Sequence, residues 1–260
     1  MPESQSDTHH TDAPTDSETI RALLNRRSIR KYTDEPLAEK TVEAILRAAF
    51  RSPTSSNIQS YSIIIVREQD TKDRLCELTN GQTHVAATSV FLAFCADLSR
   101  IAHAVQKEGF SMDDNNLELG LVASIDVALV GMSAYIAAES LGIQGLMIGA
   151  VRNKPEEVAQ LLGLPPQVYC VFGMCLGWPA EAPPQKPRMA YENIVHYERY
   201  EAGGAGHAVT DYDKKLANHY RSMGKITTDD SWSHDIGIKL GNRPRDTLRQ
   251  VLKGRGIDWT

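Results

Sequence analysis

The chain has 260 residues, of which 42% are hydrophobic and 23% charged, the composition of an ordinary globular protein with room for one large domain or two small ones. Its 28 basic residues stand against 33 acidic ones, for a formal net charge of −5 at pH 7. This acidic balance argues against a nucleic acid or an anionic membrane as partner, so any anion-binding site must be a local cluster of basic side chains.

The N-terminal residues 1–16 are rich in Ser, Thr, Asp and His, and we expect them to form a disordered tail. The first helix is predicted to begin at Ser17, because serine is a favoured residue at the N-cap. This helix runs into three arginines and one serine within residues 26–30. Such a cluster is either a solvated charged face or a phosphate-binding site, and taken alone it leaves both interpretations open.

The next part of the chain alternates helices and strands. A helix is predicted over residues 38–50, where apolar residues recur on one face, and a polar loop of hydroxyl and amide side chains follows at 52–57. Four further elements are predicted from the apolar and turn-forming residues: a buried strand at 61–66, a short helix at 70–78, a turn at 80–81 and a buried strand at 90–96.

The segment 119–140 is long and apolar enough to suggest a membrane-spanning helix. Asp126 and Glu139 lie within it, so we interpret it as the buried central helix of the fold. Because it is apolar nearly all round, it must be covered on every side, and we expect a second subunit to contribute. The polar residues 107–116 before it predict a mobile loop or lid.

Three more core elements follow the central helix. A short strand is predicted at 145–149 and a longer one at 168–176. Between them a helix is predicted to start at Asn153, because Glu156 stands at the spacing of a capping box, and to end at Gly163. With four predicted strands among helices, the fold class is α+β or α/β, and we favour α+β.

The character of the sequence changes after residue 178. Residues 179–190 are rich in proline, and Gly203-Gly204-Ala205-Gly206 is predicted to be a linker. Surface helices are expected at 211–222 and 244–253, with a polar loop between them. We therefore expect these last residues to form an extension laid over the core.

Cysteine spacing and the N-terminus indicate the cellular compartment. Cys76, Cys95, Cys170 and Cys175 show no Cys-x-x-Cys spacing, and we expect them to be reduced thiols. The N-terminal residues contain no apolar stretch of the kind found in a signal peptide. We expect a cytoplasmic protein.

Familiar catalytic and cofactor motifs are missing from the sequence. No Gly-x-Gly-x-x-Gly opens a helix after a strand, and there is no Walker loop, His-Glu-x-x-His, zinc-type Cys/His cluster or Gly-x-Ser-x-Gly. We expect no metal site. What is left is a set of polar groups that could converge on a planar phosphorylated ligand: the arginine cluster, the loop at 54–57 with Gln59, and the distant pair Lys186 and Arg188.

The order of several short motifs resembles that of the nitroreductase and flavin reductase family, in particular its NADPH-dependent, oxygen-insensitive branch. The resemblance covers about residues 18–258 and is carried by Arg-Arg-Ser-Ile-Arg-Lys-Tyr from Arg26, Ser-Pro-Thr-Ser-Ser-Asn-Ile-Gln from Ser52, Gly-Gln-Thr-His-Val from Gly81, Ala-Glu-Ser-Leu-Gly from Ala138, Ile-Gly-Ala-Val-Arg-Asn from Ile148, Phe-Gly-Met-Cys-Leu-Gly-Trp-Pro from Phe172, and Lys-Pro-Arg from Lys186.

The resemblance implies a mixed sheet flanked by helices, in an intertwined homodimer with two FMN sites at the subunit interface. It implies a core at 17–200, which binds FMN, and a helical C-terminal extension at 201–260, packed on the core or on the partner subunit. The central helix would then pack against its counterpart.

The resemblance also implies roles for individual residues. Arg26, Arg27 and Ser28 would hold the FMN phosphate together with Lys186 and Arg188. Arg30 would lie at the N1–C2 carbonyl edge of the flavin and stabilise the reduced, anionic form. Four further contacts with the flavin are implied: Thr54 and Ser55 from the partner subunit, Gln82 at the pyrimidine edge, and the backbone of Ile148 and Gly149 near N5 and O4.

The reaction implied by the resemblance is ping-pong hydride transfer from NADPH or NADH, through flavin N5, to a nitroaromatic, quinone or flavin acceptor. No side chain is assigned as an obligatory acid or base. For the nicotinamide phosphate only Arg221 and Lys225 are candidates, and Asp229-Asp230 would repel it, so NADH could serve as well as NADPH. Two alternatives stay open: a non-catalytic flavin-binding or redox-sensing protein on the same scaffold, and an unrelated domain that binds a phosphorylated ligand.

Overall fold

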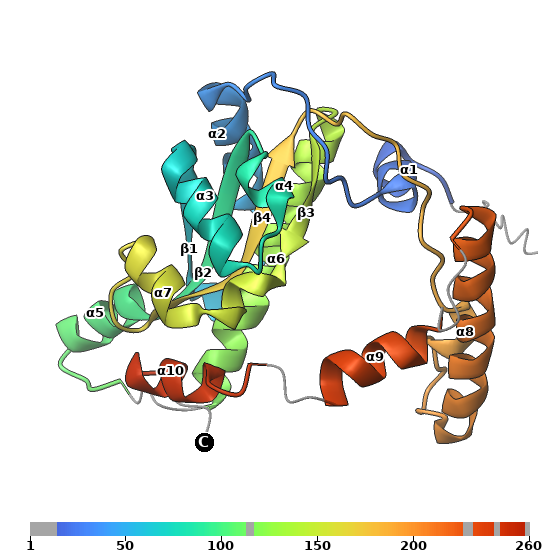
Figure 1. The fold of residues 1–260 in the computed structure, drawn as a ribbon. Helices are drawn as coiled ribbons and strands as arrows, with labels where there is room; N and C mark the ends of the chain where they lie inside the picture. Colours follow the sequence, from blue (N-terminus) through green and yellow to red (C-terminus); the bar gives the residue numbers. More distant parts are fainter. Residues whose placement is uncertain (1–14, 113–116, 226–230, 242–244, 258–260) are drawn as a thin grey trace, which may run out of the picture.

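At the centre of the computed structural model lies one four-stranded sheet, in the order β1-β2-β4-β3 (Figure 1). The structure describes residues 15–112, 117–225, 231–241 and 245–257. The strands are β1 (Tyr61–Val66), β2 (Val90–Asp97), β3 (Gln144–Ile148) and β4 (Val168–Gly177). All neighbouring pairs among these described strands are antiparallel. The sheet that they form is therefore not the mixed sheet that the resemblance implies. An antiparallel sheet with helices packed on it confirms the α+β class.

Burial differs between the middle and the edge of the sheet. Every residue of β2 is buried, and so is nearly all of β4, because both strands have neighbours on two sides. Strand β1 lies at an edge, where Ile65 is 45% exposed and only Val66 is fully buried. The strand was predicted correctly at 61–66, but the prediction that it is buried is wrong, since an edge strand has one free side.

Helix α6 (Leu117–Ser140) crosses one face of the sheet beside α2 (Glu39–Ala49) (Figure 1). By length and composition α6 is the one helix of the described residues that could span a membrane. Nine of its residues are buried within this chain, however, including Asp126 and Tyr135, as expected of a central helix. Its other side is open: Leu121, Ile125 and Leu129 recur every fourth residue and are exposed, so this chain alone does not cover the helix.

The remaining core helices are short. Helix α1 (Glu18–Asn25) begins as predicted, with Ser17 Oγ accepting a hydrogen bond from Ile20 N. The others are α3 (Gln69–Leu78), α4 (Thr83–Ala86), α5 (Ser99–Lys107) and α7 (Pro155–Leu161), with 3₁₀ turns η1 (Ser55–Asn57), η2 (Gly149–Asn153) and η3 (Tyr191–Asn193). Helices α4 and α5 were not predicted. The predicted tail at 1–16 lies almost wholly outside the described residues, and so do residues 113–116 of the predicted lid at 107–116.

The predicted capping box at α7 is wrong. Lys154 precedes the helix, and no side chain caps it. Asn153 instead ends the turn η2, where its Oδ1 accepts a hydrogen bond from Arg245 Nε at 3.1 Å. A side chain committed to a partner 92 residues away cannot also cap a helix that starts two residues later.

The C-terminal region contains three helices, α8 (Ala205–Ser222), α9 (Trp232–Gly241) and α10 (Leu248–Gly254). The Gly203–Gly206 stretch, predicted to be a linker, belongs to the 3₁₀ turn η4 (Ala202–Gly204) and the start of α8. Helix α9 was not predicted. Figure 1 shows α8 and α9 standing to one side of the sheet, while α10 returns to the core, where Leu252 and Ile257 are buried. Only part of the extension is therefore laid over its own core.

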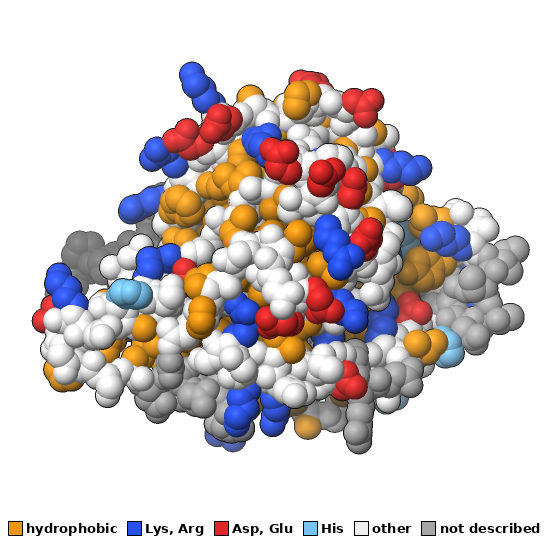
Figure 2. Space-filling model, turned by 60° about the vertical axis from the view of Figure 1, so that its left-hand side comes forward, with side chains coloured by type: hydrophobic (Ala, Val, Ile, Leu, Met, Phe, Trp, Pro, Cys, Tyr) orange, Lys and Arg blue, Asp and Glu red, His pale blue; other side chains and the backbone are white. Residues whose placement is uncertain are grey.

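Charged side chains are distributed unevenly. On the face shown in Figure 2, basic and acidic side chains of the described residues are interspersed. Basic side chains gather instead where residues 26–30 lie near residues 183–188, which follow β4 in the sequence. This region is therefore a local concentration of positive charge on a protein whose net charge is negative.

Candidate functional site

The arginine segment, residues 26–30, runs beside the strap, which we define as residues 179–188. The isolated bridge between Tyr32 and Pro179 joins the two stretches just beyond the arginine segment. Two side chains of the strap then hold the backbone of the arginine segment: Glu181 Oε1 accepts from Arg30 N at 2.7 Å, and Gln185 Nε2 donates to Arg26 O at 3.1 Å. Because backbone atoms make these bonds, the basic side chains stay free to face a ligand.

Tyr135 of α6 supports the same segment from the core. Its hydroxyl donates to Arg27 O at 2.8 Å and lies 3.1 Å from Gly145 O, and the Arg26 guanidinium sits 5.6 Å above its ring. Burial, followed by the nearby Glu139, raises the pKa of Tyr135 to about 12, so the hydroxyl keeps its proton and its role as donor. The arginine segment is thus fixed to the central helix.

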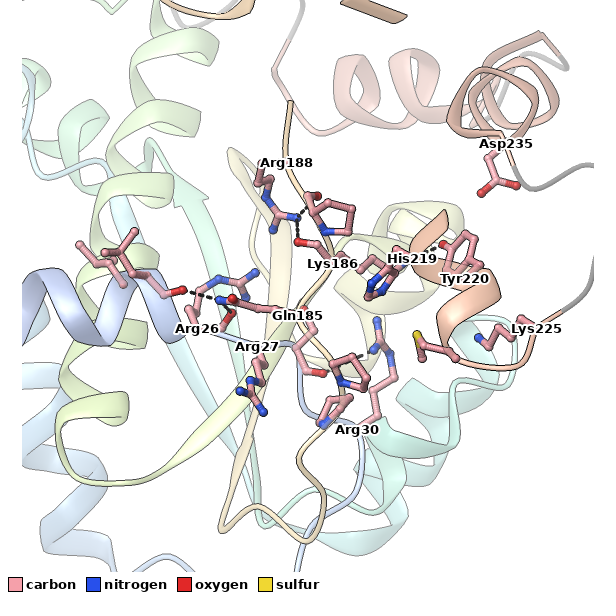
Figure 3. Close-up of a pocket in the computed structure, with 17 residues that line it drawn as sticks. Arg26, Arg27, Arg30, Gln185, Lys186, Arg188, His219, Tyr220, Lys225 and Asp235 are labelled. Atoms are coloured by element: carbon pink, nitrogen blue, oxygen red, sulfur yellow. Dashed lines mark hydrogen bonds between the residues drawn. The ribbon is translucent and has the colours of Figure 1, made fainter. Parts of the chain in front are cut away.

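The arginine segment, the strap and α8 line a cavity of about 1140 Å³ (Figure 3). Figure 3 shows Arg26, Arg27 and Arg188 grouped around Gln185, with Arg30 extending toward His219. One acidic residue of the described chain, Asp235, also lines the cavity. As predicted from the sequence, the two groups of cations meet in one place. The polar lining relevant to an anion consists of Arg26, Arg27, Ser28, Arg30, Lys186, Arg188 and Lys225.

Tyr220 of α8 is a lining residue that the sequence did not single out. Lys186 Nζ donates to its hydroxyl at 3.0 Å, and both Lys186 and Lys225 lie 5.5 Å from its ring centroid. An aromatic face attracts cations, so Tyr220 holds two lysines of the cavity near each other. Arg221, the other candidate for a nicotinamide phosphate, does not line the cavity, and its guanidinium donates to Asn218 Oδ1 at 3.0 Å.

Several predicted site residues lie outside the cavity of this single chain. Its lining does not include Thr54, Ser55, Gln82, Ile148 or Gly149. The hydroxyl-rich loop at 54–57 lies against α6, where Ser55 N donates to Asp126 Oδ1 at 3.0 Å. One chain therefore brings the arginine segment together with Lys186 and Arg188 and leaves the other predicted flavin contacts apart.

Gln82 lies beside His84, and the His84 ring is close enough to Arg30 to be affected by its charge. Gln82 Oε1 is 3.2 Å from His84 Nε2. Burial, and then the positive charge of Arg30, lower the pKa of His84 below its ordinary value of 6.5. His84 is therefore neutral near pH 7 and available to hydrogen-bond Gln82.

This shift predicts an acid-sensitive contribution to stability. Because the unfolded chain takes up the proton more readily than the folded one, the stability that neutral His84 contributes is present above 6.5 and is lost as pH falls through 6.5 toward the lower pKa of the folded state. Between about pH 7.5 and about pH 5.5, we expect the Tm of His84→Gln, measured by calorimetry, to fall less than the Tm of the parent protein. Equal losses in the two proteins would contradict this assignment.

The turn after β3 is held by a second residue that the sequence analysis missed. Arg245 Nη2 donates to Gly149 O at 3.2 Å, in addition to its bond with Asn153. A Cβ at position 149 would lie 3.3 Å from the Arg152 guanidinium, so glycine keeps this turn free of crowding. Burial and the charge of Arg152 lower the pKa of Arg245. No local pattern signals such a contact between residues 96 positions apart.

Comparison with known proteins matches the N-terminal and the C-terminal part of the chain to models of the same family. A sequence model of the nitroreductase family matches residues 23–178, and a model of the C-terminal domain of the same family matches residues 186–260. The oxygen-insensitive NADPH nitroreductase of Salmonella typhimurium is 39% identical over 240 residues, which cover 92% of this chain and 98% of that protein. The FMN reductase (NAD(P)H) of Bacillus subtilis is 35% identical over 246 residues, covering 93% of this chain and 98% of that protein. The solved structure of B. megaterium NfrA1 superposes with a TM-score of 0.90 at 34% identity, covering 93% of this chain and 100% of that one.

Proposed function

The chain belongs to the nitroreductase family, and on that premise we propose that it is an FMN-dependent NAD(P)H oxidoreductase that reduces nitroaromatic, quinone or flavin acceptors. The observation that carries the proposal is the cavity, which cations from three separate stretches of sequence line together with Ser28. Bound FMN would supply the two-electron chemistry that links a reduced nicotinamide to the acceptor.

The lining suits a phosphorylated flavin. Each charge-assisted hydrogen bond to a phosphate contributes about 1.5–3 kcal/mol, so several together outweigh the repulsion among the gathered cations. We assign the phosphate to Arg26, Arg27 and Ser28, together with Lys186 and Arg188 of the strap, which line the same cavity. The Arg30 side chain is exposed, and among the described residues its guanidinium donates only to Ser28 O, at 3.5 Å, which leaves it free to lie along the ring and stabilise negative charge there.

In this proposal no side chain acts as an obligatory acid or base. The protein binds and orients the reactants, and Arg30 favours the reduced state of the cofactor electrostatically. The backbone of Ile148 and Gly149 would approach the ring, with Arg245 and Arg152 keeping the turn in place. Gln82, hydrogen-bonded by neutral His84, would contact the pyrimidine edge.

The proposal also requires a homodimer. The neutral contacts, Thr54 and Ser55, lie outside the cavity of their own chain, and the α6 stripe formed by Leu121, Ile125 and Leu129 is exposed. An exposed apolar stripe on a central helix is typical of a subunit interface. We propose that two copies pair through α6, that each FMN takes Thr54 and Ser55 from the partner subunit, and that the extension at 201–260 packs partly on the partner beside the core at 17–200. We place this enzyme in the cytoplasm.

Two measurements on the purified protein test the proposal in sequence. A visible flavin spectrum is expected, and anaerobic mixing with NADPH or NADH should bleach it rapidly. A yellow protein that does not bleach would favour a non-catalytic flavin-binding or redox-sensing protein on this scaffold. A colourless protein that gains no flavin on incubation with FMN would favour a domain that binds another phosphorylated ligand.

The preference between nicotinamides is expected to be modest. Among the described candidates for the 2′-phosphate only Lys225 lines the cavity, and one charge-assisted contact accounts for about a tenfold preference. Asp229 and Asp230 lie outside the described residues. We expect kcat/KM for NADPH to exceed that for NADH by no more than about tenfold, and Lys225→Ala to bring the ratio near one. A preference of about a hundredfold or more would contradict this assignment.

A further inference from the structure

The loop at 54–60 has an unusual backbone. Ser56, Asn57 and Gln59 adopt φ values of 47°, 58° and 54°, in the left-handed region that residues other than glycine rarely occupy. Three such residues within four positions are sparsely populated in a free chain, and they persist only where the surroundings hold them. Strain of this kind is concentrated at functional sites.

Asp126 of α6 holds the loop at both of its ends. It is completely buried, at 0% exposure, although the helix around it is apolar. Its Oδ1 accepts from Ser55 N at 3.0 Å, and its Oδ2 accepts from Ser60 Oγ at 2.9 Å and from Ser60 N at 3.3 Å. A buried carboxyl group in a helix is costly unless donors surround it, and here both oxygens serve this one loop.

Two further side chains, Ser52 and Arg100, hold the chain on either side of the loop. On one side Ser52 Oγ lies 2.7 Å from Ser133 Oγ of α6. On the other side Arg100 donates to Gln59 O at 3.3 Å and also to Tyr61 O. The loop is therefore fixed to α6 before it and to α5 after it, with Asp126 at its centre.

Ser60 Oγ serves Asp126, but the three hydroxyls at the start of this fixed loop have no such partner among the described residues. Ser55, Ser56 and Asn57 are exposed, and the hydroxyls of Thr54, Ser55 and Ser56 make no hydrogen bond to any other residue that the structure describes. A rigid backbone that carries free hydroxyls is a preformed polar edge, since it loses little conformational freedom when a ligand arrives.

We propose that Asp126 is the positioning residue that preforms the 54–60 loop as the polar edge offered to the flavin of the partner subunit. The inference rests on the proposed function, because the ligand is the FMN assigned there. Asp126 does not touch the flavin; it determines whether Thr54 and Ser55 meet it in one conformation or in many. Its loss should therefore weaken the binding of FMN and leave turnover on bound FMN unchanged.

The test compares the full-length variants Asp126→Asn and Asp126→Ala with the parent protein by FMN titration. Asparagine keeps an acceptor for Ser55 but presents a donor to Ser60, so we expect the Kd for FMN to rise about tenfold, and about a hundredfold in the alanine variant. In both variants kcat should return to the parent value at saturating FMN. Hydrogen exchange of the Ser55 and Ser60 amides should accelerate.

Tyr169→Phe is the matched control. It removes a buried hydroxyl that lies 2.6 Å from Ser124 Oγ, and thus weakens the packing of the same helix without touching the loop. Its Kd for FMN should equal that of the parent. If Asp126→Ala does not fold, Ser60→Ala supplies the milder change, removing one of the three bonds to Asp126, with an expected rise in Kd of about threefold.

The possible outcomes separate the two proposals. A parent protein that binds FMN, together with an Asp126→Asn variant of unchanged Kd, would overturn the inference alone. An equal rise in Kd in Tyr169→Phe would reduce Asp126 to a general stabiliser of α6 and also overturn it. A parent protein that does not bind FMN would overturn the proposed function, and the inference with it.

Discussion

Replacing Ile125 with aspartate is expected to convert the protein to a monomer and to raise the Kd for FMN at least about a hundredfold. Ile125 is 56% exposed, in the middle of the apolar stripe on α6. In the proposed dimer it is buried against the second copy, where an unpaired carboxylate costs several kcal/mol. Because Thr54 and Ser55 reach the flavin from the other subunit, separation of the subunits also removes part of the site.

Light scattering with size-exclusion chromatography measures the oligomeric state, and FMN titration measures the affinity. Gln106→Asp, which adds the same charge to the exposed surface of α5, is the control and should remain dimeric with unchanged affinity. The key comparison is between the two properties in one variant. A monomeric Ile125→Asp protein that binds FMN as the parent does would show that one chain holds the whole site, contrary to the proposal.

The strands were predictable because their signal is local. Short apolar runs bounded by turn-forming residues predict all four strands to within one residue of their observed ends. The same runs do not reveal which strand lies at an edge. That property depends on the order β1-β2-β4-β3, which brings together strands that are distant in the chain, and it explains why β1 is less buried than its composition suggests.

Three helices of the described residues were not predicted, α4, α5 and α9, and the last two were missed for different reasons. Helix α5 carries a local signal that the sequence analysis did not use: Asp97 Oδ1 accepts from Ser99 N at 3.0 Å at the start of the helix. Helix α9 contains Gly237, an unfavourable residue inside a helix, and its first turn is held from α8, where Asp213 accepts from Ser233 N at 2.8 Å. The start of α9 therefore depends on a residue that lies 20 positions earlier.

The same distinction applies to the site. The arginine segment and the Lys186–Arg188 pair stand out as charged residues in short stretches, and the structure brings them into one cavity. Arg245, Tyr220 and Asp126 act through partners far away in the sequence, and only the fold reveals them. Asp126 stands out in the sequence as a charge in an apolar helix, but spacing does not reveal its partners in the 54–60 loop.

Replacing Arg26 with alanine is expected to raise the Kd for FMN about a hundredfold while leaving the reduction potential of the flavin that does bind nearly unchanged. Arg26 is held over the Tyr135 ring at the phosphate end of the proposed site, where it contributes a charge-assisted hydrogen bond of up to about 3 kcal/mol. Both oxidation states of FMN carry the same phosphate, so this bond does not distinguish between them. Equilibrium dialysis measures the affinity, and a redox titration measures the potential.

Arg30→Ala is the matched partner of that variant, since it removes the same side chain four residues further along the same segment. Arg30 faces the ring in the proposed site and favours the reduced, anionic flavin over the oxidised one. Its loss should raise the Kd of oxidised FMN by less than about tenfold and lower the potential on the order of 30 mV, the equivalent of about 1.4 kcal/mol for two electrons. The two variants thus separate binding from redox tuning. Equal losses of affinity with unchanged potentials in both variants would show that the whole arginine segment binds the phosphate. The division of roles between Arg26 and Arg30 would then be wrong.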